Sequence, residues 1–182
     1  MLAISKQGRI QSDIRKWYKN PEMIVALSAL LIGLVTAFTS IYSAYVDREY
    51  SRASVWPRLE IFRSFSGDSF SYGVSNNGTG PAVIKYAKVH DGEKYVKSWR
   101  EIESFENIIQ SHISTRILSP QNSIMPVAYQ GESADALATA DTSITIELCY
   151  CSIYDECWVI DRSNRPTNVQ ACMIDDEQRF LQ

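Results

Sequence analysis

Charged side chains are absent from 24 consecutive residues of this chain, residues 23–46, although charged residues make up 21% of the sequence. A helix rises about 1.5 Å per residue, so this run reaches roughly 36 Å and can cross a hydrocarbon core about 30 Å thick. Lipid offers no partners to backbone polar groups, so a spanning segment must satisfy them internally as a helix. The missing charge therefore predicts a transmembrane helix over residues 23–46.

The length of this run and the residues beside it favour a membrane anchor that stays in the mature protein over a signal peptide that is cleaved off. Asn20 is suited to cap a helix, Pro21 to occupy its first position and Glu22 to complement its positive end. A cleaved signal peptide has an apolar core of about 7 to 15 residues and a small residue at its cleavage site. Here the apolar run is longer, and Tyr42 stands where a small residue is required. We therefore expect that the segment is not removed.

Cysteine is absent before residue 149, and basic residues are unevenly distributed about the span. Lys and Arg resist translocation, and five of them precede the span against three in the 15 residues after it. An even set of cysteines suits an oxidising compartment. We expect a bacterial inner membrane protein with a cytoplasmic N-terminus and a periplasmic C-terminal domain. The basic residues are Lys6, Arg9, Arg15, Lys16 and Lys19 before the span, and Arg48, Arg52 and Arg58 after it.

Acidic residues are scarce before the end of the span and dominate after it. Residues 1–46 contain five basic and two acidic side chains, and residues 47–182 contain 13 and 19. The acidic domain gives no support for a nucleic-acid partner, whereas the basic segment can lie against anionic lipid headgroups. Within residues 9–19, Ile10, Ile14, Trp17 and Tyr18 follow helical spacing. This pattern fits an interfacial helix, and an ordinary flank of a span remains the alternative.

Bulky side chains are missing from part of the predicted span. Ala29, Gly33 and Ala37 recur every four residues, and a second stripe follows at Thr36, Ser40 and Ala44. Small residues let helices approach closely in lipid, but they are frequent in any span. The first stripe is our candidate packing face for self-association or for another membrane protein.

Repeats and low-complexity linkers are absent after the span, which favours one domain. We divide the chain into a cytoplasmic basic segment (1–22), the transmembrane helix (23–46), a helical stalk (47–56) and an extracytoplasmic domain (57–182). Pro57 sets the end of the stalk, because the residue before a proline is disfavoured in a helix.

The domain shows strand patterns separated by turn residues. Phe70, Tyr72 and Val74 alternate with small or polar residues, and Asp91-Gly92 predicts a hairpin turn. Ser98 and Glu101 form a helix-capping pattern. We predict an antiparallel, immunoglobulin-like β-sandwich with one inserted amphipathic helix. The predicted strands cover residues 58–64, 70–75, 82–90, 93–97, 113–118, 124–129, 143–151, 156–161 and 169–174, and the helix stripe is Trp99, Ile102, Phe105, Ile108 and Ile109.

The most distinctive chemistry lies in the segment CYCSIYDECW, residues 149–158. Cys149 and Cys151 share one strand face, and a turn at Tyr154 would set Cys151 opposite Cys157. Four cysteines allow three pairings, among which sequence does not choose. We favour Cys151 with Cys157 and Cys149 with Cys172. A zinc or copper(I) site is the alternative, but the spacing lacks the paired C-x-x-C of common zinc sites.

Catalytic motifs are missing altogether. The chain has no G-x-S-x-G, no H-E-x-x-H and no phosphate-binding glycine loop, and its two histidines, His90 and His112, are remote from the cysteines in sequence. We expect no enzymatic activity, no cofactor, no metal and no small-molecule substrate.

A strand, the loop NNGTGPA at residues 76–82, an apolar strand and the late CYCSIYDECW together resemble small bacterial single-span membrane proteins of uncharacterised function. The resemblance implies a cell-envelope location and an extracytoplasmic β-sandwich, and it transfers no active-site residue. The predicted function is a membrane-anchored interaction module, a non-enzymatic subunit of an envelope or membrane complex. The alternative is a sensor or regulatory subunit that relays an extracytoplasmic signal to a cytoplasmic or membrane partner.

Overall fold

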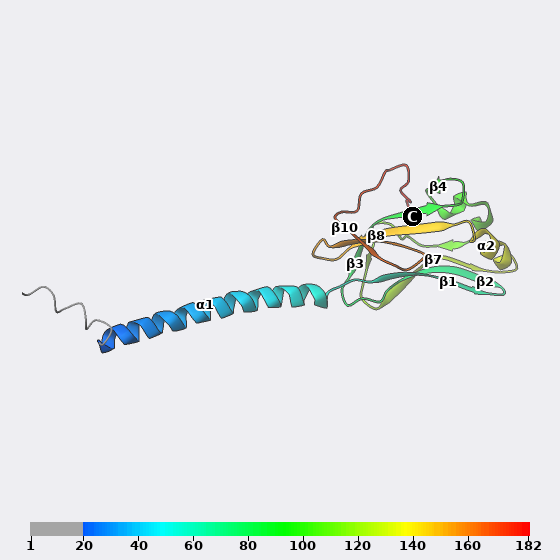
Figure 1. Cartoon of the computed structure of the whole chain (residues 1–182). Helices are drawn as coiled ribbons and strands as arrows, with labels where there is room; N and C mark the ends of the chain where they lie inside the picture. The colour runs from blue at the N-terminus through cyan, green and yellow to red at the C-terminus, as the bar shows by residue number, and fades with distance from the viewer. Residues whose placement is uncertain (1–19) are drawn as a thin grey trace, which may run out of the picture. The chain divides into compact units, whose positions relative to one another are not determined.

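A computed structural model of the protein describes residues 20–182. The chain falls into two compact units, of which the first ends at Tyr50 and the second covers residues 51–182. The helix and strands are labelled in Figure 1. The interfacial helix predicted within residues 9–19 lies outside the described residues.

The first unit consists of most of one long helix, α1 (Pro21–Ser54, 34 residues). It begins at the predicted proline, and the Asn20 carbonyl accepts hydrogen bonds from the amides of Met23 and Ile24 (3.1 and 3.2 Å). Among the described residues, α1 is the one helix long and apolar enough to cross a membrane, judged by length and composition alone. Its hydroxyl groups bond to the helix itself: Thr36 donates to the Ile32 carbonyl and Ser40 to the Thr36 carbonyl. Polar groups satisfied in this way suit an apolar environment.

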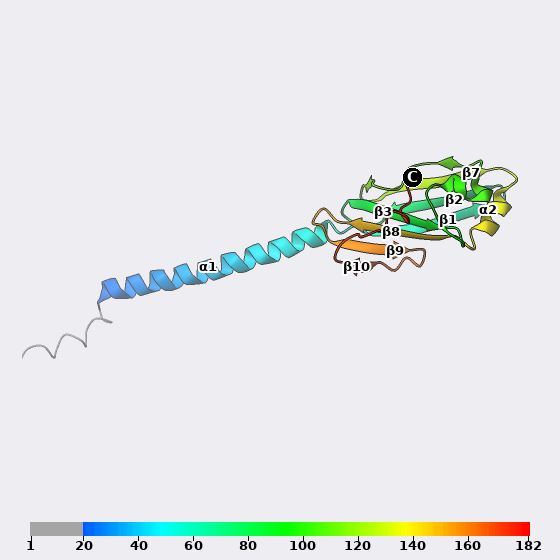
Figure 2. The same cartoon turned by 90° about the horizontal axis from the view of Figure 1, so that it is seen from above.

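The second unit is built from two antiparallel sheets (Figures 1 and 2). Sheet A has the strand order β1-β2-β7-β5, and sheet B has the order β10-β9-β8-β3-β4, with β6 paired to β3. Sheet A contains β1 (Leu59–Ser66), β2 (Ser69–Asn76), β7 (Asn122–Gln130) and β5 (Ile109–Gln110). Sheet B contains β10 (Thr167–Val169), β9 (Cys157–Asp161), β8 (Thr145–Cys151), β3 (Ala82–His90), β4 (Tyr95–Val96) and β6 (Ile117–Leu118).

Period-two alternation turns one side of each sheet toward a shared core. In β2 the buried residues include Phe70, Tyr72 and Val74, as the sequence pattern predicts, and β8 contributes Ile146 and Leu148. All of these belong to one hydrophobic cluster that draws on both sheets. Alternate residues of β8 therefore face away from this core, and the cysteines of β8 are among them.

The amphipathic helix predicted over residues 98–109 is wrong. Two short 3₁₀ helices replace it, η2 (Trp99–Glu101) and η3 (Glu103–Phe105), and the backbone of Ile102 between them is extended. The buried residues Trp99, Ile102, Phe105 and Ile108 are three apart, whereas Ile109 is 74% exposed and begins β5. A spacing of three matches the 3₁₀ period and drifts off the face of an α-helix, which has 3.6 residues per turn. The stripe identified four core residues correctly and was wrong for Ile109, and it did not identify the backbone geometry.

Two further segments differ from the sequence prediction. A helix, α2 (Ala134–Ala140), forms in an Ala-rich stretch for which no helix or strand was predicted, and it buries Ala134 and Leu137. The last strand, predicted over residues 169–174, is wrong, because β10 ends at Val169. Beyond it the chain leaves the sheet, and Cys172 reaches Cys149 on β8.

The loop at residues 76–81 holds the chain that follows α1. The Asn76 side chain is fully buried, its Oδ1 accepts from the amides of Arg58 and Gly78, and its Nδ2 donates to the carbonyls of Gly80 and Leu118. These four bonds use the whole capacity of an amide side chain. The Gly80 amide also donates to the Trp56 carbonyl (3.2 Å). The turn residues read from the sequence thus form a clamp on residues 55–58.

Gly80→Ala is expected to open this clamp. A Cβ at Gly80 would lie 1.7 Å from the Val55 carbonyl oxygen, so the backbone of one segment must move. We expect the free energy of unfolding to fall by about 1–3 kcal/mol, the usual cost of overpacking, measured by urea denaturation of the full chain in detergent. Thr79→Ala is the matched control, because this exposed neighbour loses only a long side-chain hydrogen bond of 3.4 Å. Equal stability of the two variants would contradict the clamp.

Candidate functional site

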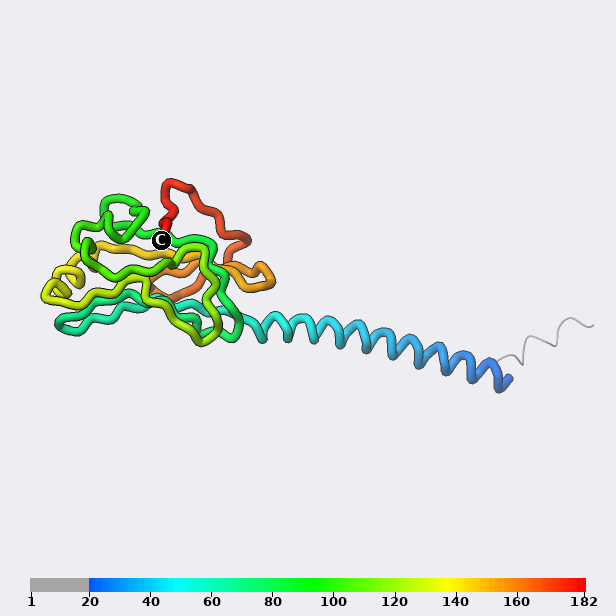
Figure 3. Tube along the Cα trace, turned by 180° about the vertical axis from the view of Figure 1, so that it is seen from behind, coloured from blue at the N-terminus to red at the C-terminus, as the bar shows by residue number. Residues whose placement is uncertain are grey.

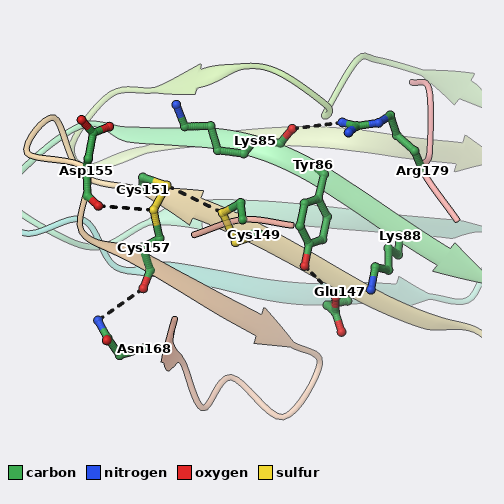
Figure 4. The surroundings of a disulfide bond; sticks show 11 residues. Lys85, Tyr86, Lys88, Glu147, Cys149, Cys151, Asp155, Cys157, Asn168 and Arg179 are labelled. Carbon is green, nitrogen blue, oxygen red and sulfur yellow. Dashed lines mark hydrogen bonds and ion pairs between the residues drawn. A yellow bond between two sulfur atoms is a disulfide. The ribbon is translucent and has the colours of Figure 1, made fainter. Parts of the chain in front are cut away.

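The four cysteines gather on the side of sheet B that faces away from the core (Figure 4). Cys149 and Cys151 alternate along β8 with residues of the hydrophobic core. Cys157 begins β9 directly opposite Cys151 in the antiparallel register. Cys172 comes from the segment after β10. Three separate parts of the chain therefore contribute sulfur to one place, which we call the cysteine cluster.

Within the cysteine cluster the sulfurs lie in two pairs at disulfide distance. Cys149 and Cys172 have Cα atoms 5.7 Å apart, and Cys151 and Cys157 have Cα atoms 4.0 Å apart. These are the pairs favoured from the sequence, and no cysteine is left unpaired in the described chain. The hairpin between Cys151 and Cys157 is closed by Ser152, whose Oγ accepts from the amides of Tyr154 and Glu156 (3.1 and 3.3 Å).

The two pairs also touch each other. The Sγ atoms of Cys151 and Cys172 are 3.7 Å apart, and the sulfurs of Cys151, Cys157 and Cys172 all lie within 4.8 Å of one another. Cys149, Cys151 and Cys157 are buried, whereas Cys172 is partly exposed. Thiolates at such spacing could hold a zinc or copper(I) ion, but sulfurs bonded in pairs are not available as thiolate ligands.

The segment after β10, residues 170–182, follows this outer side and then enters the core (Figure 3). The Phe180 amide donates to the Ala87 carbonyl of β3, and the Leu181 amide to the Lys97 carbonyl, both at 2.9 Å. The Phe180 ring is fully buried and meets the Trp99 ring edge to face at 4.9 Å between centroids. The segment is thus held at one end by Cys172 and at the other by Phe180.

Close to the cysteine cluster, Glu147 joins two residues of β3 (Figure 4). Its Oε1 accepts from the Tyr86 hydroxyl (3.1 Å) and pairs with the Lys88 ammonium (3.0 Å). Burial, together with the charge of Glu147, raises the pKa of Tyr86 to about 12. The phenol therefore stays protonated as a donor at neutral pH, so this site offers no phenolate base for chemistry at the sulfurs.

A second concentration of charge lies between the sheets, and no pattern in the sequence predicted it. We call it the Asp141 cluster: Asp141, Tyr72, Arg63 and Arg162. The Asp141 side chain is 1% exposed, and it accepts hydrogen bonds from the Tyr72 hydroxyl, from Arg63 Nη1 (2.5 Å) and from Arg162 Nη2 (2.9 Å). Arg162 Nη1 also donates to the carbonyls of Asp141 and Ile144. The cluster joins β1 and β2 of sheet A to the turn after α2 and the end of β9.

The electrostatics of the Asp141 cluster favour a structural role. Burial by itself would raise the pKa of Asp141, but the hydrogen bonds from Tyr72, Arg162 and Arg63 outweigh it, and the pKa lies below its usual value. Burial and the neighbouring carboxylate raise the pKa of Tyr72, so its hydroxyl remains a donor. Since both carboxylate oxygens already accept bonds from the protein, Asp141 is poorly placed to act as a base.

A second polar contact between the sheets comes from the turn between β9 and β10. Asn164 has a positive φ of 58°, and its side chain bonds to the edge strand β1. Its Oδ1 accepts from the Ile61 amide (2.8 Å), and its Nδ2 donates to the Ile61 carbonyl (2.9 Å). This one side chain satisfies both backbone groups of an edge residue, which blocks that position against pairing with another strand.

The small residues of α1 form one face. At 3.6 residues per turn, successive residues are about 100° apart, so the stripe of Ala29, Gly33 and Ala37 and the stripe of Thr36, Ser40 and Ala44 fall together within about 100°. No residue of α1 is buried, and apart from its chain neighbours and the helix's own backbone, no described atom lies within 4 Å of a Cβ placed at Gly33. A shallow open depression follows the same side of the helix at Thr39, Ser40, Ser43, Ala44 and Asp47.

The two histidines serve local turns. His90 Nδ1 accepts from the Gly92 amide (3.0 Å), and its ring meets Tyr95 edge to face at 5.0 Å. The carbonyl of His112 accepts from the Arg116 side chain (3.3 Å). The His90 ring thus serves a turn, and the contact of His112 is made by its backbone alone.

No protein-family model matches this chain, and no functionally curated protein matches its sequence significantly. Its function must be argued from its own chemistry, which consists of an exposed apolar helix with a small face, a cysteine cluster and two sets of polar contacts between the sheets.

Proposed function

We propose that this protein is a membrane-anchored interaction module, a non-enzymatic subunit of a cell-envelope or membrane complex. The observation that carries the proposal is α1, which is 34 residues long and has no buried residue. An apolar helix without protein cover needs lipid or a partner helix around it. Its small face would allow another helix to approach closely, and this helix is either a second copy or a different membrane protein.

The orientation and the domain type form part of the proposal. Five basic residues before the span and three after it favour a cytoplasmic N-terminus at a bacterial inner membrane, with the domain in the periplasm. Four cysteines in two pairs suit that oxidising compartment. Two antiparallel sheets with a shared core are compatible with an immunoglobulin-like sandwich, a type of domain found on many cell surfaces. The resemblance to small bacterial single-span proteins points to the same location.

A sensor or regulatory subunit is the second candidate. The clamp at Asn76 supports the sensor, because its hydrogen bonds fix residues 55–58 to the loop at residues 76–81. A change in that loop would therefore be transmitted to the chain that follows α1. Affinity purification in mild detergent separates the two candidates. A constant set of envelope partners supports the interaction module, whereas a partner that changes with growth conditions supports the sensor.

Gly33→Ile tests the packing face directly. The larger side chain would hold a neighbouring helix away, so we expect association to fall at least severalfold in a membrane two-hybrid assay, or in cross-linking within native membranes. Leu31→Phe is the matched control, because it adds bulk about 160° away around the helix. Expression and membrane insertion are checked by fractionation. Unchanged association of Gly33→Ile, or equal loss in both variants, would contradict this face.

A further inference from the structure

The contact between the two cysteine pairs has a consequence beyond stability. Cys172 is bonded to Cys149, yet its Sγ lies only 3.7 Å from Cys151 Sγ. A disulfide sulfur separation is about 2.05 Å, so a shift of roughly 1.7 Å would bring Cys151 into bonding distance. Disulfides exchange by attack of a thiolate on a neighbouring disulfide sulfur. Cys151 is therefore positioned to compete with Cys149 for Cys172.

We propose that the four cysteines form one thiol–disulfide exchange site, in which Cys172 bonds either Cys149 or Cys151 and the substrate is an external dithiol. The proposal does not depend on the membrane topology, because the cysteine cluster lies entirely within the unit of residues 51–182. It assigns to the cluster a single exchange reaction per dithiol, which is not catalytic turnover and which two independent structural disulfides would not undergo.

The exchange proceeds in balanced steps. One thiolate of the dithiol attacks Cys157 Sγ, forms a mixed disulfide and expels the Cys151 thiolate. Cys151 then attacks Cys172 Sγ, which breaks the bond to Cys149 and releases Cys149 as a thiolate that takes a proton from water. The second thiol of the dithiol then attacks the first dithiol sulfur, which is bonded to Cys157 in the mixed disulfide. This closes the disulfide of the dithiol and releases Cys157 as a thiolate, which takes a proton from water. The dithiol leaves as a disulfide, and the protein has gained two electrons and two protons.

Burial gives this order of steps a chemical logic. Both partners of the Cys151–Cys157 bond are buried (Cys157 5% exposed, Cys151 2%), and attack at Cys157 is the one that expels Cys151, whose sulfur lies 3.7 Å from Cys172 Sγ. Cys149 is completely buried, so the thiol released at the end lies where a structural cysteine is inert. The site would therefore take up two electrons while keeping one of the two new thiols out of reach of solvent oxidants. Opening the Cys151–Cys157 bond also removes the covalent tie at the base of the hairpin that displays Ile153 and Tyr154.

Cys157→Ser tests the exchange by leaving Cys151 as a free thiol beside Cys172. The full-length variant is incubated in detergent with a glutathione redox buffer, its thiols are blocked with N-ethylmaleimide, and its disulfides are mapped by mass spectrometry. Chymotryptic cleavage after Tyr150 and Tyr154 puts Cys149, Cys151 and Cys157 on different peptides. We expect the Cys151–Cys172 peptide in about one tenth of the molecules or more, alongside Cys149–Cys172. Cys151→Ser is the matched control and should give Cys149–Cys172 alone, with Cys157 free.

The wild-type protein provides a second measurement that requires no substitution. Titration with limiting dithiothreitol, followed by the same blocking and mapping, should yield two-electron-reduced molecules that include the Cys151–Cys172 bond with Cys149 and Cys157 blocked. If that bond is absent from both the variant and the partly reduced wild type, the two disulfides are independent and the exchange site is refuted. If Cys157→Ser does not fold, as judged by its circular dichroism, the titration alone decides.

Discussion

Asp141→Ala is expected to lower the free energy of unfolding of the domain by roughly 3 kcal/mol, because it leaves two arginines and a buried hydroxyl without their shared acceptor. We place the loss near the lower end of the range for broken buried ion pairs, since the Arg63 and Arg162 side chains are 45% and 32% exposed and can be rehydrated. Urea or thermal unfolding of the full chain would measure it. Asp135→Ala, an exposed carboxylate in α2, is the control and should be nearly neutral.

The same cluster predicts a pH dependence. The pKa of Asp141 is lower in the folded chain than the value of about 3.9 expected for an unfolded one. A carboxyl group of this kind contributes stability above the unfolded pKa, and the contribution is lost as pH falls through the folded pKa. We therefore expect the stability advantage of the wild type over Asp141→Asn to be constant above about pH 5 and to shrink below about pH 4. An advantage that does not change with pH would show that the charge of Asp141 is irrelevant to folding.

Phe180→Ala is expected to cost about 3–5 kcal/mol, the usual range for removing a buried aromatic side chain from a core. Phe180 is fully buried against Trp99, which itself lies beside Tyr72 at 5.5 Å between ring centroids. The loss should also release the end of the chain, because the Leu181 amide and the Gln182 carbonyl bond to Lys97 and Ser114. Hydrogen exchange at the Ser114 amide, which donates to Gln182, should become faster in the variant than in the wild type.

The neighbouring position separates this specific contact from a general effect at the end of the chain. Leu181→Ala removes a smaller apolar side chain that is 60% exposed, and it leaves the backbone bonds intact. We expect a change within about 0.5 kcal/mol for this control. If both variants lost the same stability, Phe180 would not be the anchor of residues 170–182. The disulfide to Cys172 should keep the start of the segment in place in either variant.

Local rules explain most of what could be predicted. The start of α1 at Pro21 follows from Pro and Asn chemistry, and the β1–β2 and β3–β4 hairpins follow from Gly67-Asp68 and Asp91-Gly92. Cys151 faces Cys157 across the β8–β9 hairpin because the short turn between them sets the register of the two strands. By contrast, apolar residues three apart between Trp99 and Ile108 lie on one side of an α-helix for about one turn only, and the helix prediction failed there. In the structure, Trp99 packs against Tyr72 and Phe180 from a 3₁₀ turn.

By itself, the sequence determined the apolar helix, the strand-rich domain and the cysteines able to pair within one hairpin, because each depends on neighbours along the chain. The tertiary structure alone decided which distant groups meet. Asp141 lies in an unremarkable polar stretch, and its three partners are 21 to 78 residues away. Cys151 and Cys172 touch across 21 residues because the chain after β10 leaves the sheet and returns to β8. Such contacts depend on how the two sheets and the final segment pack together, which no local pattern of residues records.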